Sequence, residues 1–386
     1  MSASGEKPYR VYKGGRQKGK VPLSGRDERK QERDRDRGVV RRQRKPWTWR
    51  RWTLITLLVL VVLFVIWAVA GYLSVSGGVS DANKRLAPGT TSVLTKQNGL
   101  ILDSPTNILL LGTDHSTIQP GRSTDEHSDS MMLVRTDPSR HRITYLSIPR
   151  DLGVTINGVY QKINGAMQLG GPKLAVQTVD QLLGSQLPVN HVAVVDFSSF
   201  KKLIDAVGGI DVNVPENILS NRFDCPYSTA TRCQQWQGWR FHKGVQHMDG
   251  HTALIYSRIR ENRLDPSWTD FKRSQNQQAV MQATLAKLAS PTRFFSLPFD
   301  GSSLLAPIST DLSTWDFIQL AWVKFRAGDT VHCRLGGSAT GNGFITGTEE
   351  NIQVVQEVLG TSAPQPPAPG TGIFGPGCVV GKQSFK

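Results

Sequence analysis

The sequence feature that most constrains this chain is a run of 20 uncharged residues, LITLLVLVVLFVIWAVAGYL, which begins at Leu54 and ends at Leu73. A helix of this length spans about 30 Å, the hydrocarbon thickness of a bilayer. Tryptophans precede the run, and Trp67 and Tyr72 lie towards its far end, as aromatic residues do at membrane interfaces. The alternatives are a buried core helix and a cleaved signal peptide, but a signal peptide has a shorter apolar region. We therefore expect one transmembrane helix over residues 52–73.

Positive charge is concentrated on one side of this run. Residues 1–51 hold 18 Lys/Arg and 6 Asp/Glu, whereas residues 52–386 hold 28 and 25. Because lysine and arginine stay on the cytoplasmic side of a span, we expect a single-pass protein of the cell membrane, with residues 1–51 in the cytoplasm and residues 74–386 outside the cell. The nearly neutral body argues against a protein that binds polyanions along its whole length.

The basic tail of residues 1–51 has no apolar periodicity, and its run RDERKQERDRDR mixes charges of both signs. Such a segment cannot bury a core, so we interpret it as disordered. Its positive charge favours contact with anionic membrane lipid. Nucleic-acid binding by the tail, as in a membrane-tethered regulator, is a less favoured alternative because the tail contains no helix-turn-helix pattern.

Beyond the span, short apolar runs alternate with amphipathic stretches. Strands are predicted over residues 107–111, 131–135, 142–148, 191–197 and 210–215. Helices are predicted over residues 174–184, 198–209, 271–290, 313–326 and 348–359, with a further helix before the extended end of HMDGHTALIYSRIR. This alternation is typical of an α/β fold with a mixed central β-sheet flanked by helices.

The composition of successive segments suggests how the chain divides into parts. Residues 74–105 are polar and contain Gly and Ser, which indicates an extracellular stalk with at most a short helix. A main domain is expected over residues 106–290, with a C-terminal extension over residues 291–360. Residues 361–386 are rich in Pro and Gly, which indicates a loose tail.

The four cysteines of the chain all follow the span, and they show no spacing typical of a metal site. Cys225 and Cys233 bracket the polar insertion PYSTATR and could close a small loop, which leaves Cys333 to tie the C-terminal tail through Cys378. The alternative is four free thiols, which is less favoured in an oxidising compartment. We therefore expect two disulfide bonds outside the cell.

Charged residues are predicted to gather at one edge of the sheet. Asp114 follows the strand 107–111 at its carboxyl end, the usual side for ligands in α/β sheets. Strands 131–135 and 142–148 form a predicted antiparallel hairpin, so Asp129 before the first and Arg150 after the second lie at the same edge.

Two further arginines, Arg258 and Arg260, lie two residues apart in SRIR. On an extended segment both side chains point the same way and can grip a phosphate or pyrophosphate. Two carboxylates near several arginines indicate a Mg²⁺–pyrophosphate site, since Mg²⁺ prefers oxygen ligands. Each feature also has a purely structural explanation: an Arg-x-Arg pair can be solvated, and an aspartate after a strand can form a turn.

Several segments of the chain, taken together, carry a resemblance to a known family. They are NILLLGTD, SDSMMLV, LSIPRD, KIN, GGPKLAVQTVDQLLG, VDFSSFKKLIDAVGGIDVNVPE, LIYSRIR and FKRSQNQQ, in this order. The series covers roughly residues 106–290 and resembles the LytR-CpsA-Psr family of cell-wall biogenesis, whose members also have a short cytoplasmic tail, one span and an outer domain. The resemblance implies an α/β/α catalytic domain with an apolar groove for a lipid.

The activity that this resemblance implies is a glycopolymer transferase, an enzyme that forms a phosphodiester. Such enzymes move a wall polymer from a polyprenyl-pyrophosphate carrier to a peptidoglycan hydroxyl and use Mg²⁺. Departure of the lipid leaving group builds negative charge, which Mg²⁺ and arginines would stabilise, and a carboxylate would take the hydroxyl proton. The alternatives are a lipid- or polysaccharide-binding protein without transferase activity, a cell-envelope regulator, and a pyrophosphatase that uses water as acceptor.

The family's site residues are carried over by motif. Asp114 and Asp129 correspond to the carboxylates near the metal and the acceptor hydroxyl. The pyrophosphate-binding arginines correspond to Arg150, Arg258, Arg260 and Arg273, and Lys162 lies in the KIN segment. The family often has an arginine two residues after the first aspartate, where this chain has Ser116, and a second arginine in the long helix, where this chain has Asn276. Arg122 is a candidate for the missing charge.

Overall fold

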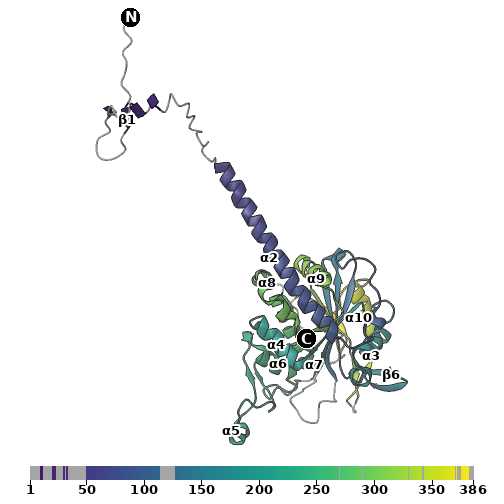
Figure 1. Ribbon diagram of the computed structural model, residues 1–386. Coiled ribbons are helices and arrows are strands. Elements are labelled where there is room, and N and C mark those ends of the chain that lie inside the picture. Colours follow the sequence, from purple (N-terminus) through teal and green to yellow (C-terminus); the bar gives the residue numbers. More distant parts are fainter. Residues whose placement is uncertain are drawn as a thin grey trace. The chain divides into compact units, whose positions relative to one another are not determined.

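The computed structural model describes residues 9–11, 20–22, 29–30, 32–33, 49–113, 127–268, 270–288, 290–328, 330–340, 343–369, 371 and 375–381 (Figure 1). The chain divides into two compact units, Met1–Leu63 and Phe64–Lys386, and each is described by itself. The described part of the first unit contains two short antiparallel strands, β1 (Tyr9–Val11) and β2 (Lys20–Pro22), where the sequence predicted disorder.

Helix α2 runs without a break over Trp49–Arg85, a length of 37 residues. Among the described residues it is the one helix long and apolar enough to cross a membrane. The side chains of residues 64–73 are mostly exposed, whereas Val79 and Ala82, three positions apart on one face, are buried in the second unit. Residues 74–85, expected as a stalk, are therefore the end of this helix and part of the domain.

A seven-stranded mixed β-sheet forms the centre of the second unit, in the order β13-β8-β3-β4-β5-β14-β17. The strands are β3 (Thr106–Thr113), β4 (Ser128–Asp137), β5 (Arg142–Ile148), β8 (His191–Asp196), β13 (Ser309–Thr310), β14 (Thr330–Arg334) and β17 (Gly377–Val380). The pairs β3–β8 and β5–β14 are parallel, and the other neighbours are antiparallel. The predicted mixed sheet is thus confirmed.

The two faces of the sheet pack against different helices. The helices of the second unit, besides the end of α2, are α3 (Gly165–Leu183), α4 (Phe197–Ala206), α5 (Ala230–Gln235), α6 (Gly250–Arg258), α7 (Asp270–Leu288), α8 (Pro291–Leu305), α9 (Thr314–Arg326) and α10 (Glu350–Leu359). Successive residues of a strand point to opposite faces. Leu133 and Leu146 therefore join a core with α3 and α10, whereas Val134 and Tyr145 point to the opposite face and contact Met281 of α7.

A second hydrophobic core joins α4, α6 and α7 to the two-stranded sheet of β9 (Ile210–Val214) and β12 (Gly244–Met248). Aspartates begin the helices of this region: Asp196 accepts a hydrogen bond from the Ser199 amide, and Asp249 accepts one from the Thr252 amide, at 2.7 Å each. Such caps satisfy an amide that the first helical turn leaves unpaired.

Smaller elements complete the described structure. They are the hairpins β6 (Gly153–Ile156) with β7 (Val159–Lys162), β10 (Ile218–Leu219) with β11 (Arg240–Phe241) and β15 (Gly337–Ala339) with β16 (Ile345–Gly347), and the 3₁₀ turns η1 (Thr91–Val93) and η2 (Pro138–Arg140).

Some elements differ from the sequence prediction. Helix α3 begins at Gly165 and kinks at Gly170 and Gly171, because Gly171 has a φ of 62°, which a helix excludes. Helix α8 follows α7 almost directly and was not predicted. Residues 377–380, expected in a loose tail, form β17 at the edge of the central sheet, where Cys333 and Cys378 are paired across β14 and β17.

Candidate active site

A cavity of about 2050 Å³ lies on the α7 face of the central sheet. Leu110, Val134 and Tyr145 from β3, β4 and β5 line its sheet side. Apolar side chains of α6 to α9 and of the α8–α9 connection extend the wall: Leu254, Ile255, Met281, Leu285, Leu304, Leu305, Ile308, Leu312, Phe317 and Leu320. The predicted site residues that the structure describes all line this same cavity: Asp129, Arg150, Lys162, Arg258, Arg260 and Arg273.

The β4–β5 hairpin brings Asp129 and Arg150 together. Met131 and Ile148 are paired across the two strands, so residues two positions further out meet at the same edge. The Arg150 Nη1 atom donates to the Asp129 Oδ1 atom at 2.6 Å, and both side chains are largely shielded from solvent. The prediction that these two residues share one edge is therefore confirmed by the geometry of the hairpin.

A second carboxylate, Asp151, extends this pair into a charged network. Its Oδ2 atom lies 3.4 Å from Arg150 Nε, and its Oδ1 atom accepts a hydrogen bond from Lys162 Nζ at 2.8 Å. The β6–β7 hairpin supplies Lys162, since Gly153 and Lys162 are paired there. The sequence analysis missed Asp151, although it directly follows Arg150 in the SIPRD segment.

The remaining predicted arginines come from α6 and α7. Helix α6 continues through Arg258, so the segment becomes extended only at Ile259 and not before the pair. Arg258 and Arg260 nevertheless both line the cavity, on either side of the fully buried Ile259. Arg273 lies in the first turn of α7, where its side chain is 4% exposed. A guanidinium that lines a cavity favours an anionic ligand there.

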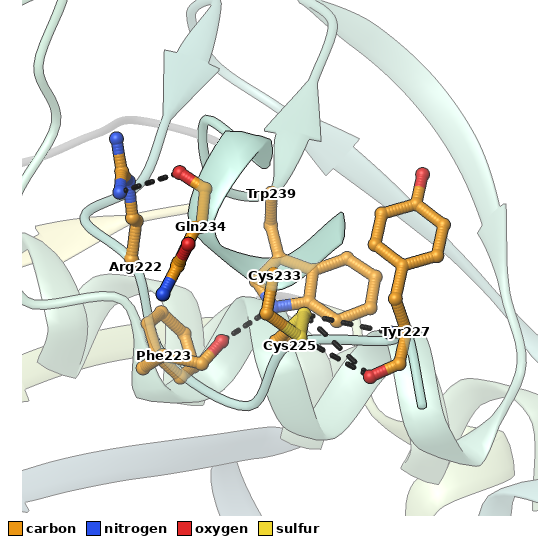
Figure 2. The surroundings of a disulfide bond; sticks show 7 residues. All are labelled: Arg222, Phe223, Cys225, Tyr227, Cys233, Gln234 and Trp239. Carbon is orange, nitrogen blue, oxygen red and sulfur yellow. Dashed lines mark hydrogen bonds between the residues drawn. A yellow bond between two sulfur atoms is a disulfide. The ribbon is translucent and has the colours of Figure 1, made fainter. Parts of the chain in front are cut away.

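The insertion between β10 and β11 reaches this arginine cluster. Asp224 forms a salt bridge with Arg258, and the Arg258 guanidinium also lies 5.7 Å from the centre of the Phe223 ring. Figure 2 shows how the insertion is held: the Trp239 indole donates to the Phe223 carbonyl at 3.0 Å, and Arg222 donates to the Gln234 carbonyl at 3.0 Å. The contact between this loop and the site was not predicted from the sequence.

Both expected cysteine pairs are present. The Cys225–Cys233 disulfide closes the insertion, with Cα atoms 5.8 Å apart (Figure 2). The Cys333–Cys378 disulfide joins β14 to β17. Among the described residues no cysteine is free.

The edge of the sheet at Asp129 carries side-chain oxygen atoms, which are the ligands that Mg²⁺ prefers. Asp114 lies outside the described residues, and the described part of the chain contains no cluster of three or more potential metal-binding side chains. Ser128 is paired with Thr113, the residue before Asp114, and its Oγ atom is buried without a hydrogen-bond partner among the described residues. A hydroxyl and carboxylates at one edge fit a hard divalent cation.

Burial also changes the acid–base behaviour of groups in the cavity wall. It raises the pKa of Tyr145 to about 12 and lowers the pKa of Lys324. Tyr145 therefore stays neutral at physiological pH and serves as an apolar wall.

The cavity thus combines an apolar body with a cluster of arginines and carboxylates. Apolar walls bury a hydrocarbon chain, and guanidinium groups bind phosphate oxygens. The fold and the site define an α/β domain suited to an amphiphile with an anionic headgroup.

Comparisons with known proteins assign the chain to a family. The model of the LytR_cpsA_psr family matches residues 70–329. The polyisoprenyl-teichoic acid–peptidoglycan teichoic acid transferase TagU of Bacillus mycoides (strain KBAB4) is 34% identical over 243 residues, which cover 62% of this chain and 70% of that protein. The chain therefore belongs to the LytR-CpsA-Psr family, as the sequence motifs indicated.

Solved structures agree with this assignment. A structure of TagT bound to LI-WTA has a TM-score of 0.53 at 25% identity and covers 71% of this chain and 98% of its own. The crystal structure of B. subtilis TagV has a TM-score of 0.51 at 26% identity and covers 67% of this chain and 97% of its own. The fold predicted from the sequence is thereby confirmed.

Proposed function

We propose that this protein transfers a cell-wall glycopolymer from a polyprenyl-pyrophosphate carrier to a hydroxyl of peptidoglycan. The observation that carries the proposal is that one cavity joins long apolar walls to Asp129, Arg150, Arg258, Arg260 and Arg273. Its volume and walls suit a polyprenyl chain, and its arginines suit a pyrophosphate. Relatives named as teichoic acid transferases support the same reaction class.

The arginines are proposed to hold the two phosphates of the carrier. Attack by the acceptor oxygen on the phosphorus next to the sugar forms a new P–O bond and breaks the bond to the bridging oxygen. The polymer then remains attached through a phosphodiester, and the lipid leaves as a polyprenyl phosphate. Guanidinium groups stabilise the charge that develops on the leaving oxygen.

A carboxylate is proposed to take the proton of the acceptor hydroxyl. Asp114 and Asp129 are the candidates from the family motif, and Asp129 lies in the described cavity. Arg150 donates a hydrogen bond to Asp129 at 2.6 Å and so orients its carboxylate. Asp151 and Lys162 extend this network and fix the position of Arg150.

A bound Mg²⁺ would supply further charge neutralisation at the pyrophosphate. The residues proposed to hold it are Asp114 and Asp129. The chain's own arginines orient the phosphates whether or not the metal is present.

The proposed location follows from helix α2 and the charge distribution. The helix anchors the chain in the membrane once, the basic residues 1–51 lie in the cytoplasm near anionic lipid, and the catalytic domain faces the cell wall. The two disulfides agree with an oxidising exterior. Nucleic acid is not among the proposed partners.

The test is a transfer assay with the full chain in detergent micelles. A labelled polyprenyl-pyrophosphate oligosaccharide serves as donor and peptidoglycan strands as acceptor. Arg150→Ala should abolish most of the transfer, whereas Asp211→Asn, in an exposed pair with His247, should leave it unchanged. Donor binding without any transfer, under conditions in which a TagU control is active, would identify a binding protein instead.

A further inference from the structure

We propose that an exposed apolar face of α8 and α9 rests in the headgroup region of the same membrane that α2 spans. This α8–α9 face consists of five side chains: Phe299, Trp315, Ile318, Trp322 and Phe325.

Helix α9 has apolar side chains on its outer side. Trp315, Ile318, Trp322 and Phe325 are spaced by three and four residues, so they form one stripe. Their exposed fractions are 53%, 43%, 52% and 79%, and Phe299 of α8 is 86% exposed. The side of α9 that carries Gln319 and Val323 is already packed, because both residues are buried. A surface helix normally has a polar outer face, so such a stripe indicates a partner.

The start of the domain fixes α8 close to the end of the span. Ser74 directly follows Leu73, the last apolar residue of the span, and its Oγ atom accepts a hydrogen bond from the Ser302 amide at 3.2 Å. A Cβ atom on Gly78 would lie 2.8 Å from the Ser302 Cα atom, so the two helices touch through glycine. Ser302 is therefore level with the first residue outside the hydrocarbon, and Phe299 lies one turn before it.

The connection from α8 to α9 is held to the same helix. The Arg85 guanidinium donates to the Leu305 carbonyl at 3.0 Å and to the Ile308 carbonyl at 2.8 Å. Figure 1 shows α8 and α9 at the end of the second unit from which α2 leaves it. Phe64, Val69 and Leu73, in the part of the span that belongs to the second unit, are exposed as well.

The chemistry of the face favours a bilayer over a protein partner. Tryptophan combines a large apolar ring with an N–H group and prefers the boundary between headgroups and acyl chains. Arg326 in the last turn of α9 is exposed and adds positive charge, which suits anionic lipid headgroups.

A consequence concerns the carrier lipid and rests on the proposed function. Val75, Gly301, Ile318, Trp322 and Phe325 also line the large cavity. With the α8–α9 face in the membrane, one side of the cavity opens towards the bilayer. A polyprenyl chain can then enter it without exposure of the whole chain to water.

The experiment uses the full chain in vesicles of phosphatidylcholine and phosphatidylglycerol, at less than one chain per vesicle. Single cysteines at Trp315→Cys and Phe299→Cys carry an environment-sensitive fluorophore. The control label is at Val159→Cys in the exposed β6–β7 hairpin, at the far end of the second unit in Figure 1. Quenching is measured with a lipid-attached nitroxide and with aqueous iodide.

We expect the labels at positions 299 and 315 to be quenched at least threefold more by the lipid nitroxide than the label at position 159, and to be shielded from iodide. Labels quenched equally by iodide at all three positions would overturn the proposal. Shielding from both quenchers at position 315 would indicate a protein contact and would overturn it too. Neither readout depends on transferase activity, so the result is separate from the test of the proposed function.

Discussion

Asp224, in the disulfide-closed insertion, forms a salt bridge with Arg258, one of the arginines proposed to bind pyrophosphate. The two side chains are about one third exposed, and both line the large cavity. A carboxylate of the protein itself is therefore paired with an arginine that we expect to bind the substrate. The insertion acts on the site through this contact.

The first prediction is that Asp224→Asn increases the affinity for polyprenyl pyrophosphate. The substitution removes the negative charge that competes with the ligand for Arg258. Because a partly exposed salt bridge contributes up to about 1 kcal/mol, the affinity should increase about two- to fivefold. Binding to the full chain in detergent would be titrated beside Asp211→Asn as a control. A lower affinity in Asp224→Asn would show instead that Asp224 positions Arg258.

Truncating the arginines themselves should have the opposite effect. Arg258→Ala and Arg260→Ala each remove a charge-assisted hydrogen bond worth about 1.5–3 kcal/mol, so the affinity should fall by roughly 10- to 100-fold. The same titration measures this change. Unchanged affinity in both variants would remove these residues from the pyrophosphate site.

The carboxylates should affect rate and metal dependence more than binding. Asp129→Asn and Asp114→Asn should each reduce transfer by at least about 100-fold, because they remove the proposed base or a Mg²⁺ ligand. Transfer is followed while Mg²⁺ is titrated, and thermal unfolding checks that the variants fold. Near-parental rates and metal dependence in both variants would show that the proposed site is wrong.

A fourth prediction concerns stability in acid. Burial lowers the pKa of His332 to about 4, and this residue stacks on Tyr145 and hydrogen-bonds to Gln282 at 2.9 Å. Between pH 6.5 and pH 4 the unfolded chain takes up a proton that the folded chain does not. The free energy of unfolding should therefore decrease as the pH is lowered through this window, by up to about 3 kcal/mol from this residue.

The His332→Gln variant should lack this contribution. Its midpoint of thermal unfolding would be compared with that of the parent at pH 7, 5.5 and 4.5, in the same detergent. The parent should lose more stability than the variant as the pH decreases. Parallel curves would mean that another group controls the acid response.

The part of the site that could be predicted depends on local geometry. A hairpin fixes which residues meet at its open edge, so Asp129 and Arg150 could be placed together from the strand pattern alone. Arg258 and Arg260 were found from their spacing, although α6 continues through the first of them. Arg273 was predicted from the family motifs alone, because no local sequence pattern indicates that this side chain is buried.

Contacts between distant segments could not be predicted in this way. Asp224 meets Arg258 only because the insertion folds back over α6, and a polar loop sequence does not specify its target. Strand β14 inserts beside β5 in parallel, which requires a long connection and leaves no local signal. For β17 the expected Cys333–Cys378 pair placed the tail near Cys333, but it did not indicate that the tail adds a strand to the sheet.

The position of β17 also affects the order of events during export. The central sheet has its last strand at residues 377–380, held to β14 by the Cys333–Cys378 disulfide. In the proposed orientation these residues are translocated after β14, so β14 emerges with an unpaired edge and a reduced thiol. Such edges recruit other strands until they are covered. The central sheet therefore gains β17 only after residues 377–380 have crossed the membrane, and the rate at which Cys333 and Cys378 are then oxidised should determine how quickly newly exported chains become resistant to proteases.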